Sequence, residues 1–444
     1  MAVILPLQGL RYTAAAGPSL ADLVTPPYDI IDSQAQKVYY QRSPYNIIRL
    51  EYGKTYPNDT PEHNRYTMAA AAFNEWQEKG ILAPEKQPAI YLYKQEFKIN
   101  NQRYIRTGFI CKVKLEPYAK GEILPHEETL PLPKNDRMAL IKACNANFSP
   151  IFGLYADPAF AVENYLHQAI QLKNVKPPEL EFTDETGQTH RLWVVTAQNV
   201  IQQVCRAMTD KLIYIADGHH RYETALEYCL AQGNGQYIMM TLVNLYDPGL
   251  VIMPTHRLIK NLERLDISNL LEILAEYFII EEFPLTLNYG NLPQFSETLT
   301  EHSDSAKGLV NNTPLRKRHA FGLYCGNHKL YLLILKDKKN ISLLMPGDKS
   351  ITWQNLDVTI LHYLVLEKLL KVKNLNTGNY TGYTSNAREA LIAVDKKQYQ
   401  LAFLLNPTLI SEVITIAKNR EKMPQKSTFF YPKLITGLVI SKLS

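Results

Sequence analysis

Alternating apolar and polar positions predict two antiparallel hairpins in the first half of the chain. The first pairs the β-branched and aromatic runs at residues 89–97 and 104–115, which are joined by a short Asn-Asn turn. The second pairs residues 179–182 with residues 190–195 across a polar turn that contains glycine. Both hairpins indicate a sheet with antiparallel neighbours in the N-terminal part of the chain.

A polar segment, residues 126–137, lies between the two hairpins. Pro131 and Pro133 interrupt it, so we expect a loop there rather than a helix. The segment is dense in groups that act as acids, bases or cations, and loops of this kind often carry function. Its candidate residues are His126, Glu127, Glu128, Lys134 and Arg137.

A buried strand that leads directly into a helix is predicted near the middle of the chain. Residues 212–216 form an apolar run, and an apolar stripe at helical spacing extends from Tyr222 to a stop at Gly233. The polar turn Ala-Asp-Gly-His-His-Arg, residues 216–221, lies between these two segments. The pattern therefore places this turn at the N-terminus of a helix.

The second half of the chain alternates helical and strand-like segments. Residues 303–318 form a turn-rich, charged stretch that indicates a domain junction. The expected helices are residues 266–278, 355–372, 385–394 and 407–418, and the expected strand is residues 401–405. We predict a mixed α/β (α+β) protein with an N-terminal domain (1–260), a helical connection (261–310) and a smaller C-terminal α/β domain (311–444).

Length and composition agree with a folded protein of two domains. The chain has 444 residues, more than a single core normally supports; 46% of them are apolar and 20% are charged. The net charge of +5 is small for this length, and long blocks of lysine and arginine are absent from the sequence. We interpret the basic cluster Arg316-Lys317-Arg318-His319 as a solvated loop. A nucleic-acid partner is therefore not indicated.

Cysteine usage and hydropathy favour a cytoplasmic protein. The five cysteines include no C-x-x-C pair, which indicates neither a disulfide framework nor a tetrahedral zinc site. The N-terminus lacks the basic region and the apolar run of a signal peptide. No stretch reaches the roughly 18 apolar residues that span a bilayer, so we expect no membrane partner.

The polar turn at residues 216–221 is the best candidate for chemistry. The first N–H groups of a helix lack intrahelical acceptors and lie at the positive end of its dipole, an arrangement that favours phosphate. Gly218 allows a tight turn and close approach of a ligand, while His220 and Arg221 add donors. Asp217 is suited to orient a hydroxyl, to bind Mg²⁺ or to hold a histidine in one tautomer. A purely structural turn is the alternative interpretation.

Other ionisable residues gain a functional role only if the fold brings them together. His126, Glu127 and Glu128 are as consistent with a solvated acidic loop as with acid–base work. Taken singly, five further candidates are more simply explained by structure: Asp29, Lys134, Arg137, His256 and Arg257.

Six short motifs give the chain a resemblance to a conserved prokaryotic family, domain of unknown function 1015. The motifs are residues 25–29, 43–50, 124–127, 149–155, 216–222 and 423–428. The resemblance covers nearly the whole chain, but the family name implies no activity.

A remoter resemblance concerns only the string Asp-Gly-His-His-Arg at residues 217–221, which looks like the nucleotide-phosphate box of the partition-protein (ParB)/sulfiredoxin superfamily. Sulfiredoxins carry a cysteine where this chain has His219, so the thiol for sulfinic-acid repair is missing. DNA-partition members add a helix-turn-helix after the box, whereas strand-like residues 237–253 follow it here. Free-serine kinases of the superfamily carry the full string.

The resemblance to the kinases implies phosphoryl transfer, in either direction, between a nucleotide (ATP or ADP) and a small hydroxyl compound. L-serine and O-phosphoserine are the specific expectation. The resemblance further implies that residues 218–221 hold nucleotide phosphates and that Asp217 acts near Mg²⁺ or the substrate hydroxyl. The string does not align the general base, for which Glu127, beside His126, is our candidate ahead of Asp29.

Two other functions stay open at this point. A nucleotide-binding DNA-partition or regulatory module predicts steeply salt-dependent DNA binding, although no helix-turn-helix is recognisable. A non-enzymatic scaffold predicts that no nucleotide raises the melting temperature.

Overall fold

The computed structural model describes residues 2–171, 177–233, 235–303, 309–310, 313–314, 319–336, 344–372 and 379–443. Residues 316–318 of the expected basic cluster, and most of the expected junction at 303–318, lie outside this description. The chain forms two compact units. Unit 1 comprises Met1–Pro125, Thr129–Val251 and Pro432–Ser444, and unit 2 comprises His126–Glu128 and Ile252–Tyr431. The sequence predicts three domains with boundaries at residues 260 and 310, and this division into separately folding domains stays a prediction.

Unit 1 is built on a mixed sheet, and the strands described for it follow one another across the sheet in the order β6, β11, β8, β12, β5, β4, β10, β9, with β1 added beside β5. Their bounds are β6 Ile123–Leu124, β11 Ile213–Asp217, β8 Ile151–Tyr155, β12 Tyr237–Asn244, β5 Gln102–Lys114, β4 Ile90–Ile99, β10 Thr189–Val195, β9 Leu180–Thr183 and β1 Ile4–Leu5. The pairs β6–β11 and β8–β12 are parallel and the other pairs are antiparallel. Both predicted hairpins, β4–β5 and β9–β10, are present, and the mixed α/β fold class is confirmed.

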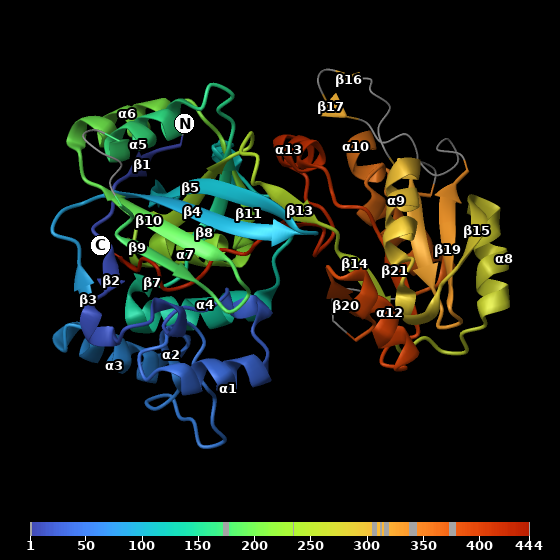
Figure 1. Cartoon of the computed structure of the whole chain (residues 1–444), viewed down its shortest axis with the longest axis horizontal. Coiled ribbons are helices and arrows are strands. Elements are labelled where there is room, and N and C mark those ends of the chain that lie inside the picture. Colours follow the sequence, from blue (N-terminus) through green and yellow to red (C-terminus); the bar gives the residue numbers. More distant parts are fainter. Residues whose placement is uncertain are drawn as a thin grey trace. The chain divides into compact units, whose positions relative to one another are not determined.

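Helices lie on both sides of this sheet. They are α1 Ser33–Arg42, α2 Ile48–Glu51, α3 Arg65–Glu78, α4 Pro131–Cys144, α5 Ala161–Gln171, α6 Gln198–Met208 and α7 His219–Gln232. Helices α5 and α6 pack Val162, Leu166, Val200 and Val204 into the core formed with the sheet. In Figure 1 these two helices lie above the sheet, whereas α1 to α4 lie below it.

The loop predicted over residues 126–137 is wrong in its second half, because helix α4 begins at Pro131. Pro131 and Pro133 both occupy the first turn of α4, where backbone N–H groups have no intrahelical acceptor. A missing N–H therefore costs nothing there, and the fixed proline φ suits a helix start. Proline marks the beginning of this helix rather than its interruption.

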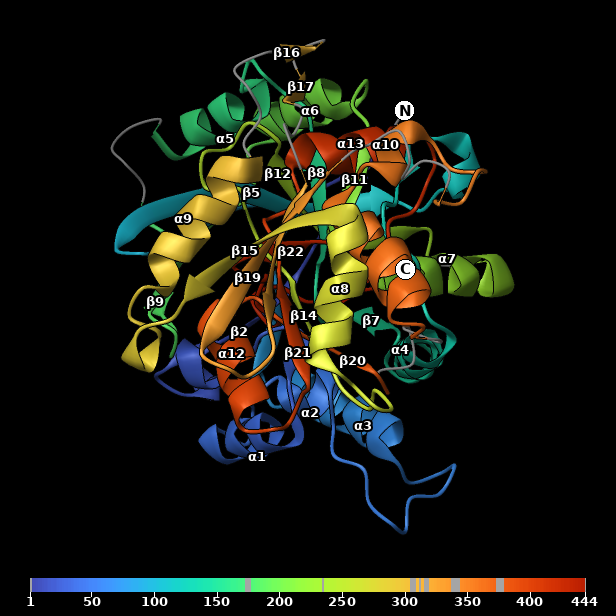
Figure 2. The same cartoon turned by 90° about the vertical axis from the view of Figure 1, so that its right-hand side faces the viewer.

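Unit 2 contains an antiparallel sheet with the strand order β15, β19, β18, β21, β14, β20. The strands are β15 Phe278–Pro284, β19 Lys329–Leu335, β18 Ala320–Tyr324, β21 Leu401–Leu404, β14 His256–Ile259 and β20 Thr381–Thr384. Its helices are α8 Ile267–Tyr277, α9 Leu292–Ser303, α10 Ile351–Gln354, α11 Asp357–Thr359, a π-helix over Ile360–Leu369, α12 Ala387–Asp395 and α13 Ile410–Lys418. Figure 2 shows β15 and β19 between α9 and α8. In the part of the chain that the structure describes, no helix has the length and apolar character to cross a membrane.

The C-terminal segment, residues 432–443, returns to unit 1 after the chain has completed unit 2. Leu10 and Ile440 exchange two backbone hydrogen bonds, of 2.8 and 2.9 Å. Thr25 and Thr436 exchange another two, of 3.3 and 2.7 Å. Strand β23 (Ser441–Lys442) then pairs with β7 (Ala146–Asn147). The segment is thus bonded to unit 1 at several points along its length.

Candidate functional site

The polar turn between β11 and α7 has the geometry that the sequence predicts. Strand β11 ends at Asp217, Gly218 adopts the left-handed conformation (φ 93°, ψ 26°), and α7 begins at His219. A Cβ at position 218 would lie 2.9 Å from Nη2 of Arg221. The positive φ favours glycine here, and a larger side chain would also have to displace the guanidinium that folds back over the turn.

Asp217 binds two cations at this turn. Its Oδ1 lies 2.9 Å from Nζ of Lys433, and its Oδ2 lies 3.2 Å from Nη2 of Arg221. The Arg221 and Lys433 side chains are only 11% and 10% exposed, while that of Asp217 is 20% exposed. The acid and both cations therefore face each other in a partly buried site rather than in bulk solvent.

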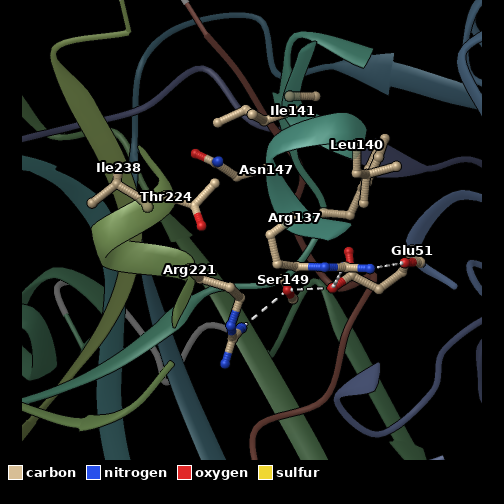
Figure 3. A pocket seen from close by; sticks show the side chains of 11 residues that line it. Glu51, Arg137, Leu140, Ile141, Asn147, Ser149, Arg221, Thr224 and Ile238 are labelled. Carbon is tan, nitrogen blue, oxygen red and sulfur yellow. Dashed lines mark hydrogen bonds and ion pairs between the residues drawn. The ribbon is translucent and has the colours of Figure 1, made fainter. Parts of the chain in front are cut away.

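Arg221 is also bonded to the chain before β8. Its Nη1 donates to Oγ of Ser149 at 3.0 Å and to the carbonyl oxygen of Pro150 at 2.7 Å. The Ser149 hydroxyl in turn donates to Oε1 of Glu51 at 2.8 Å, and Nη1 of Arg137 lies 3.1 Å from the same oxygen. Figure 3 shows this network running from Arg221 through Ser149 to Glu51 and Arg137.

The network borders a small pocket. The cavity measures about 40 Å³, and its lining combines Glu51, Arg137, Ser149, Arg221 and Thr224 with apolar side chains. Complete ligand pockets usually measure about 300–1,000 Å³. The cavity therefore has room for a phosphate-sized group or part of a small metabolite, but not for a whole nucleotide.

Glu51 and Arg137 form a buried ion pair in the wall of the pocket, with side chains 3% and 6% exposed. Burial raises the pKa of Glu51, and the neighbouring Arg137 and Arg221 oppose that rise. Burial alone would lower the pKa of Arg137, but Glu51 and Asp136 together raise it. The Arg137 guanidinium also lies 3.9 Å above the ring of Tyr28. Each charge can thus be buried because the opposite charge of its partner compensates for the lost hydration.

Several predicted residues of unit 1 make contacts away from this network. His220 Nε2 accepts a hydrogen bond of 2.9 Å from the backbone N–H of Leu130, at the start of α4. His219 is buried at the first position of α7. Lys134 pairs with Glu227 on α7 at 2.7 Å, and Asp29 is exposed. The phosphate-binding roles of the two histidines stay predictions.

Four other predicted residues belong to unit 2, and three of them contact its terminal segment. His126 is fully buried, with Nε2 2.9 Å from the Thr428 hydroxyl. Glu127 accepts a hydrogen bond of 3.0 Å from the backbone N–H of Lys426. Arg257 donates to the carbonyl oxygen of Lys426 at 3.0 Å. These residues therefore bind the backbone and side chains of the motif at 423–428.

His256, the fourth of these residues, is held in its neutral form. Its Nδ1 accepts a hydrogen bond of 3.2 Å from the backbone N–H of Leu405, which requires an unprotonated nitrogen. Burial and the neighbouring Arg257 lower its pKa from 6.5 to about 3. The contribution of His256 to stability is therefore complete above pH 6.5 and is lost as the pH falls towards 3.

We expect His256→Asn to weaken the acid sensitivity of unit 2. Wild-type unfolding free energy should fall by about 1.4 kcal/mol per pH unit below 6.5 because of this group. Asparagine retains an acceptor for Leu405 but cannot take up the proton. Denaturant unfolding at pH 7.5 and pH 5 measures the effect, with the exposed His328→Asn as control. Equal pH dependence in wild type and His256→Asn would contradict the assignment.

Three residues of the site were not singled out from the sequence: Glu51 and Ser149 of the pocket network, and Lys433, which pairs with Asp217. Glu51 directly follows the motif at 43–50, Ser149 opens the motif at 149–155, and Lys433 lies a few residues beyond the motif at 423–428. Their positions in or near these motifs are thus the sequence signal that could have identified them. Among the described residues, no three His, Cys, Asp or Glu side chains come together as a metal site, so Asp217 stands there as a single candidate ligand for Mg²⁺.

Comparison with solved structures gives distant likenesses. One is a conserved hypothetical protein from Pyrococcus furiosus, with 13% identity and a TM-score of 0.35, covering 75% of this chain and 95% of that chain. A free serine kinase in complex with AMP has 13% identity and a TM-score of 0.33, covering 74% and 92%. SbnI from Staphylococcus aureus, truncated at its C-terminus, has 11% identity and a TM-score of 0.34, covering 75% and 87%. At these scores the likenesses carry no conclusion about activity.

Comparison with protein families identifies the family of the chain, whereas comparison with individual proteins does not. No curated protein matches the chain. A family described as protein of unknown function (DUF1015) matches residues 4–359, which confirms the resemblance carried by the short motifs. Because this match spans most of its 444 residues, the chain belongs to the DUF1015 family.

Proposed function

We propose that unit 1 catalyses nucleotide-dependent phosphoryl transfer involving a small hydroxyl metabolite, with L-serine and O-phosphoserine as the first candidates. One observation carries the proposal. At the start of α7 the Asp217 carboxylate binds both Lys433 and Arg221, and Arg221 continues into a pocket that also presents Glu51. Phosphoryl transfer depends mainly on positioning and on neutralising charge, and this site supplies cations and carboxylates in fixed positions.

The residues of the turn would have different roles in the reaction, according to their chemistry. Arg221 would hold phosphate oxygens, with the N-terminus of α7 contributing its dipole. Mg²⁺ commonly binds one or two protein carboxylates together with substrate phosphates. Both oxygens of Asp217 already contact cations, so Mg²⁺ would bind this carboxylate only in place of Lys433 or Arg221. When bound, Mg²⁺ would neutralise charge on the phosphate oxygens. Because the cavity measures only about 40 Å³, the base and ribose would bind outside it.

The proton acceptor has two candidates. Glu127 stays the residue expected from the sequence, and its contacts within unit 2 leave its role a prediction. Glu51 is the second candidate, because it is joined to Arg221 through the Ser149 hydroxyl and lines the pocket. Comparison of Glu51→Gln with Glu127→Gln separates them, since the true general base should lower kcat about 10²–10⁴-fold when its proton acceptor is removed.

The proposal predicts that nucleotides stabilise the protein. At a nucleotide concentration of about 100 times Kd the free energy of unfolding should rise by about 2.7 kcal/mol, which thermal melting detects. ATP and ADP are tested with Mg²⁺, each with and without L-serine or O-phosphoserine, and phosphate transfer is followed by ³¹P NMR. Adenosine, which lacks phosphate, serves as control. If neither nucleotide shifts the melting temperature and no transfer occurs, the proposed function is overturned.

A further inference from the structure

We infer that Lys433, carried by the C-terminal segment, is a second phosphate-binding cation of unit 1. This inference rests on the phosphate site proposed above and assigns part of that site to the last residues of the chain. The family match ends at residue 359, so the role is assigned from the geometry of this chain alone.

The backbone on either side of the Lys433 side chain is held by buried polar groups. Nη2 of Arg106 donates to the carbonyl oxygen of Pro432 at 2.7 Å. The side-chain amide of Gln95 donates to the carbonyl oxygen of Lys433 at 3.1 Å. Arg106 and Gln95 are each 1% exposed and lie on paired positions of β5 and β4. The sheet of unit 1 therefore fixes the position from which the lysine extends.

The Lys433 side chain is directed to Asp217 instead of to solvent. Lysine side chains usually keep the ammonium group hydrated, and ordering one costs rotamer entropy. Here Nζ lies 2.9 Å from Asp217 Oδ1, in a side chain that is 10% exposed. Lys433 and Arg221 thus approach the two oxygens of one carboxylate from different parts of the chain.

A third cation, Arg106, lies near Asp217. Arg106 lies near enough to Asp217 and Asp247 for both acids to raise its pKa, although burial lowers that pKa to about 10 overall.

The arginine that holds Pro432 also has an unsatisfied donor, which supports an anion near the C-terminal segment. Nη1 of Arg106 is buried without a hydrogen-bond partner. A buried donor of a charged group that lacks an acceptor is costly, and such groups normally have a partner in the functional state. A phosphate group would supply the missing acceptor oxygen.

The test compares Lys433→Met with Lys442→Met, an exposed lysine of the same C-terminal segment. Isothermal titration measures the Kd of inorganic pyrophosphate and of Mg²⁺–ADP at two salt concentrations. Lys433→Met loses one charge-assisted hydrogen bond, so it should bind both ligands about 10- to 100-fold more weakly than wild type does. The salt dependence of its binding should also be smaller. Lys433→Arg should restore part of the affinity, and Lys442→Met should bind as wild type does.

The outcomes separate this inference from the proposed function. If Lys433→Met binds both ligands with wild-type affinity, Lys433 serves only as a counter-ion of Asp217 and the inference is overturned, while phosphoryl transfer stands or falls by its own assay. If wild type binds pyrophosphate through Lys433 but transfers no phosphate, the inference stands and the proposed function fails. If wild type binds neither ligand at millimolar concentration, both are overturned. Circular dichroism of each variant confirms that the fold is retained.

Discussion

Arg137→Ala is expected to lower the free energy of unfolding of unit 1 by about 3–5 kcal/mol, the usual cost of removing one partner from a buried ion pair. Glu51 would keep the Ser149 hydroxyl but lose the guanidinium that lies 3.1 Å from its Oε1. Its backbone carbonyl would also lose the 3.1 Å hydrogen bond from Arg137 Nη2. A carboxylate left alone in this wall must either stay charged without a partner or take up a proton, and either choice destabilises the fold.

Two variants make this prediction specific. Arg103→Ala removes an arginine that is 59% exposed and ion-paired with Glu96, so it should cost at most about 1 kcal/mol. Replacing both Glu51 and Arg137 with methionine should cost less than Arg137→Ala, because no unpaired charge stays behind. Chemical denaturation monitored by circular dichroism measures all three. Similar losses of unfolding free energy for Arg137→Ala and Arg103→Ala would contradict the predicted contribution of the Glu51–Arg137 pair to stability.

Arg221→Ala should lower phosphoryl-transfer activity about 10²–10³-fold, the range seen when a positioned charge-stabilising donor is removed from an active site. The guanidinium meets Asp217, Ser149 and Pro150 at once, which fixes its plane beside the turn. Arg221→Lys should recover little, because an ammonium group cannot reproduce a two-pronged contact. Initial rates with Mg²⁺–ATP and L-serine measure the effect.

The matched control for this experiment is Arg206→Ala, an exposed arginine on helix α6 of the same unit. It should leave the rate and the melting temperature close to wild type. The proposal about Arg221 is contradicted if Arg221→Ala keeps wild-type turnover while remaining folded. If Arg221→Ala loses both turnover and melting temperature, unfolding alone would explain the loss of activity. Asp217→Asn is then the variant to measure, because it removes the acid charge and keeps nearly the same shape.

Local signals in the sequence predicted much of unit 1. The Asn-Asn turn predicted the β4–β5 hairpin because Asn100 and Asn101 tolerate the positive φ values, 48° and 65°, that a two-residue hairpin turn requires. The apolar run before Asp217 and the stripe after Arg221 predicted β11, the turn and α7. Helix α4 was missed because proline was taken as an interruption when it marks a helix start.

In unit 2 the helix expected over 355–372 is present from Asp357 to Leu369, but its last ten residues are π-helical. Apolar periodicity does not distinguish this geometry, because the hydrophobic residues are spread around the helix rather than along one stripe.

The rest of the candidate site depends on contacts between distant parts of the chain. Glu51, Ser149 and Arg221 meet only because α2, β8 and α7 fold together, and no local pattern encodes their distances. The sequence placed Asp217 and Arg221 at a helix start but could not show that Lys433 lies beside them. It also grouped His126 and Glu127 with the turn; the structure assigns both residues to unit 2, and their role in a common site stays a prediction.

The bonding of the C-terminal segment to unit 1 has a consequence for synthesis. The ribosome releases residues 432–443 only after all of unit 2 has emerged, yet Leu10, Thr25 and β7 all take their partners from that segment. Unit 1 therefore cannot reach its final structure before this segment is made, and Leu10 and Thr25 stay without these backbone partners until then. A stop codon just before residue 432 would leave all of unit 2 intact and still leave unit 1 incomplete.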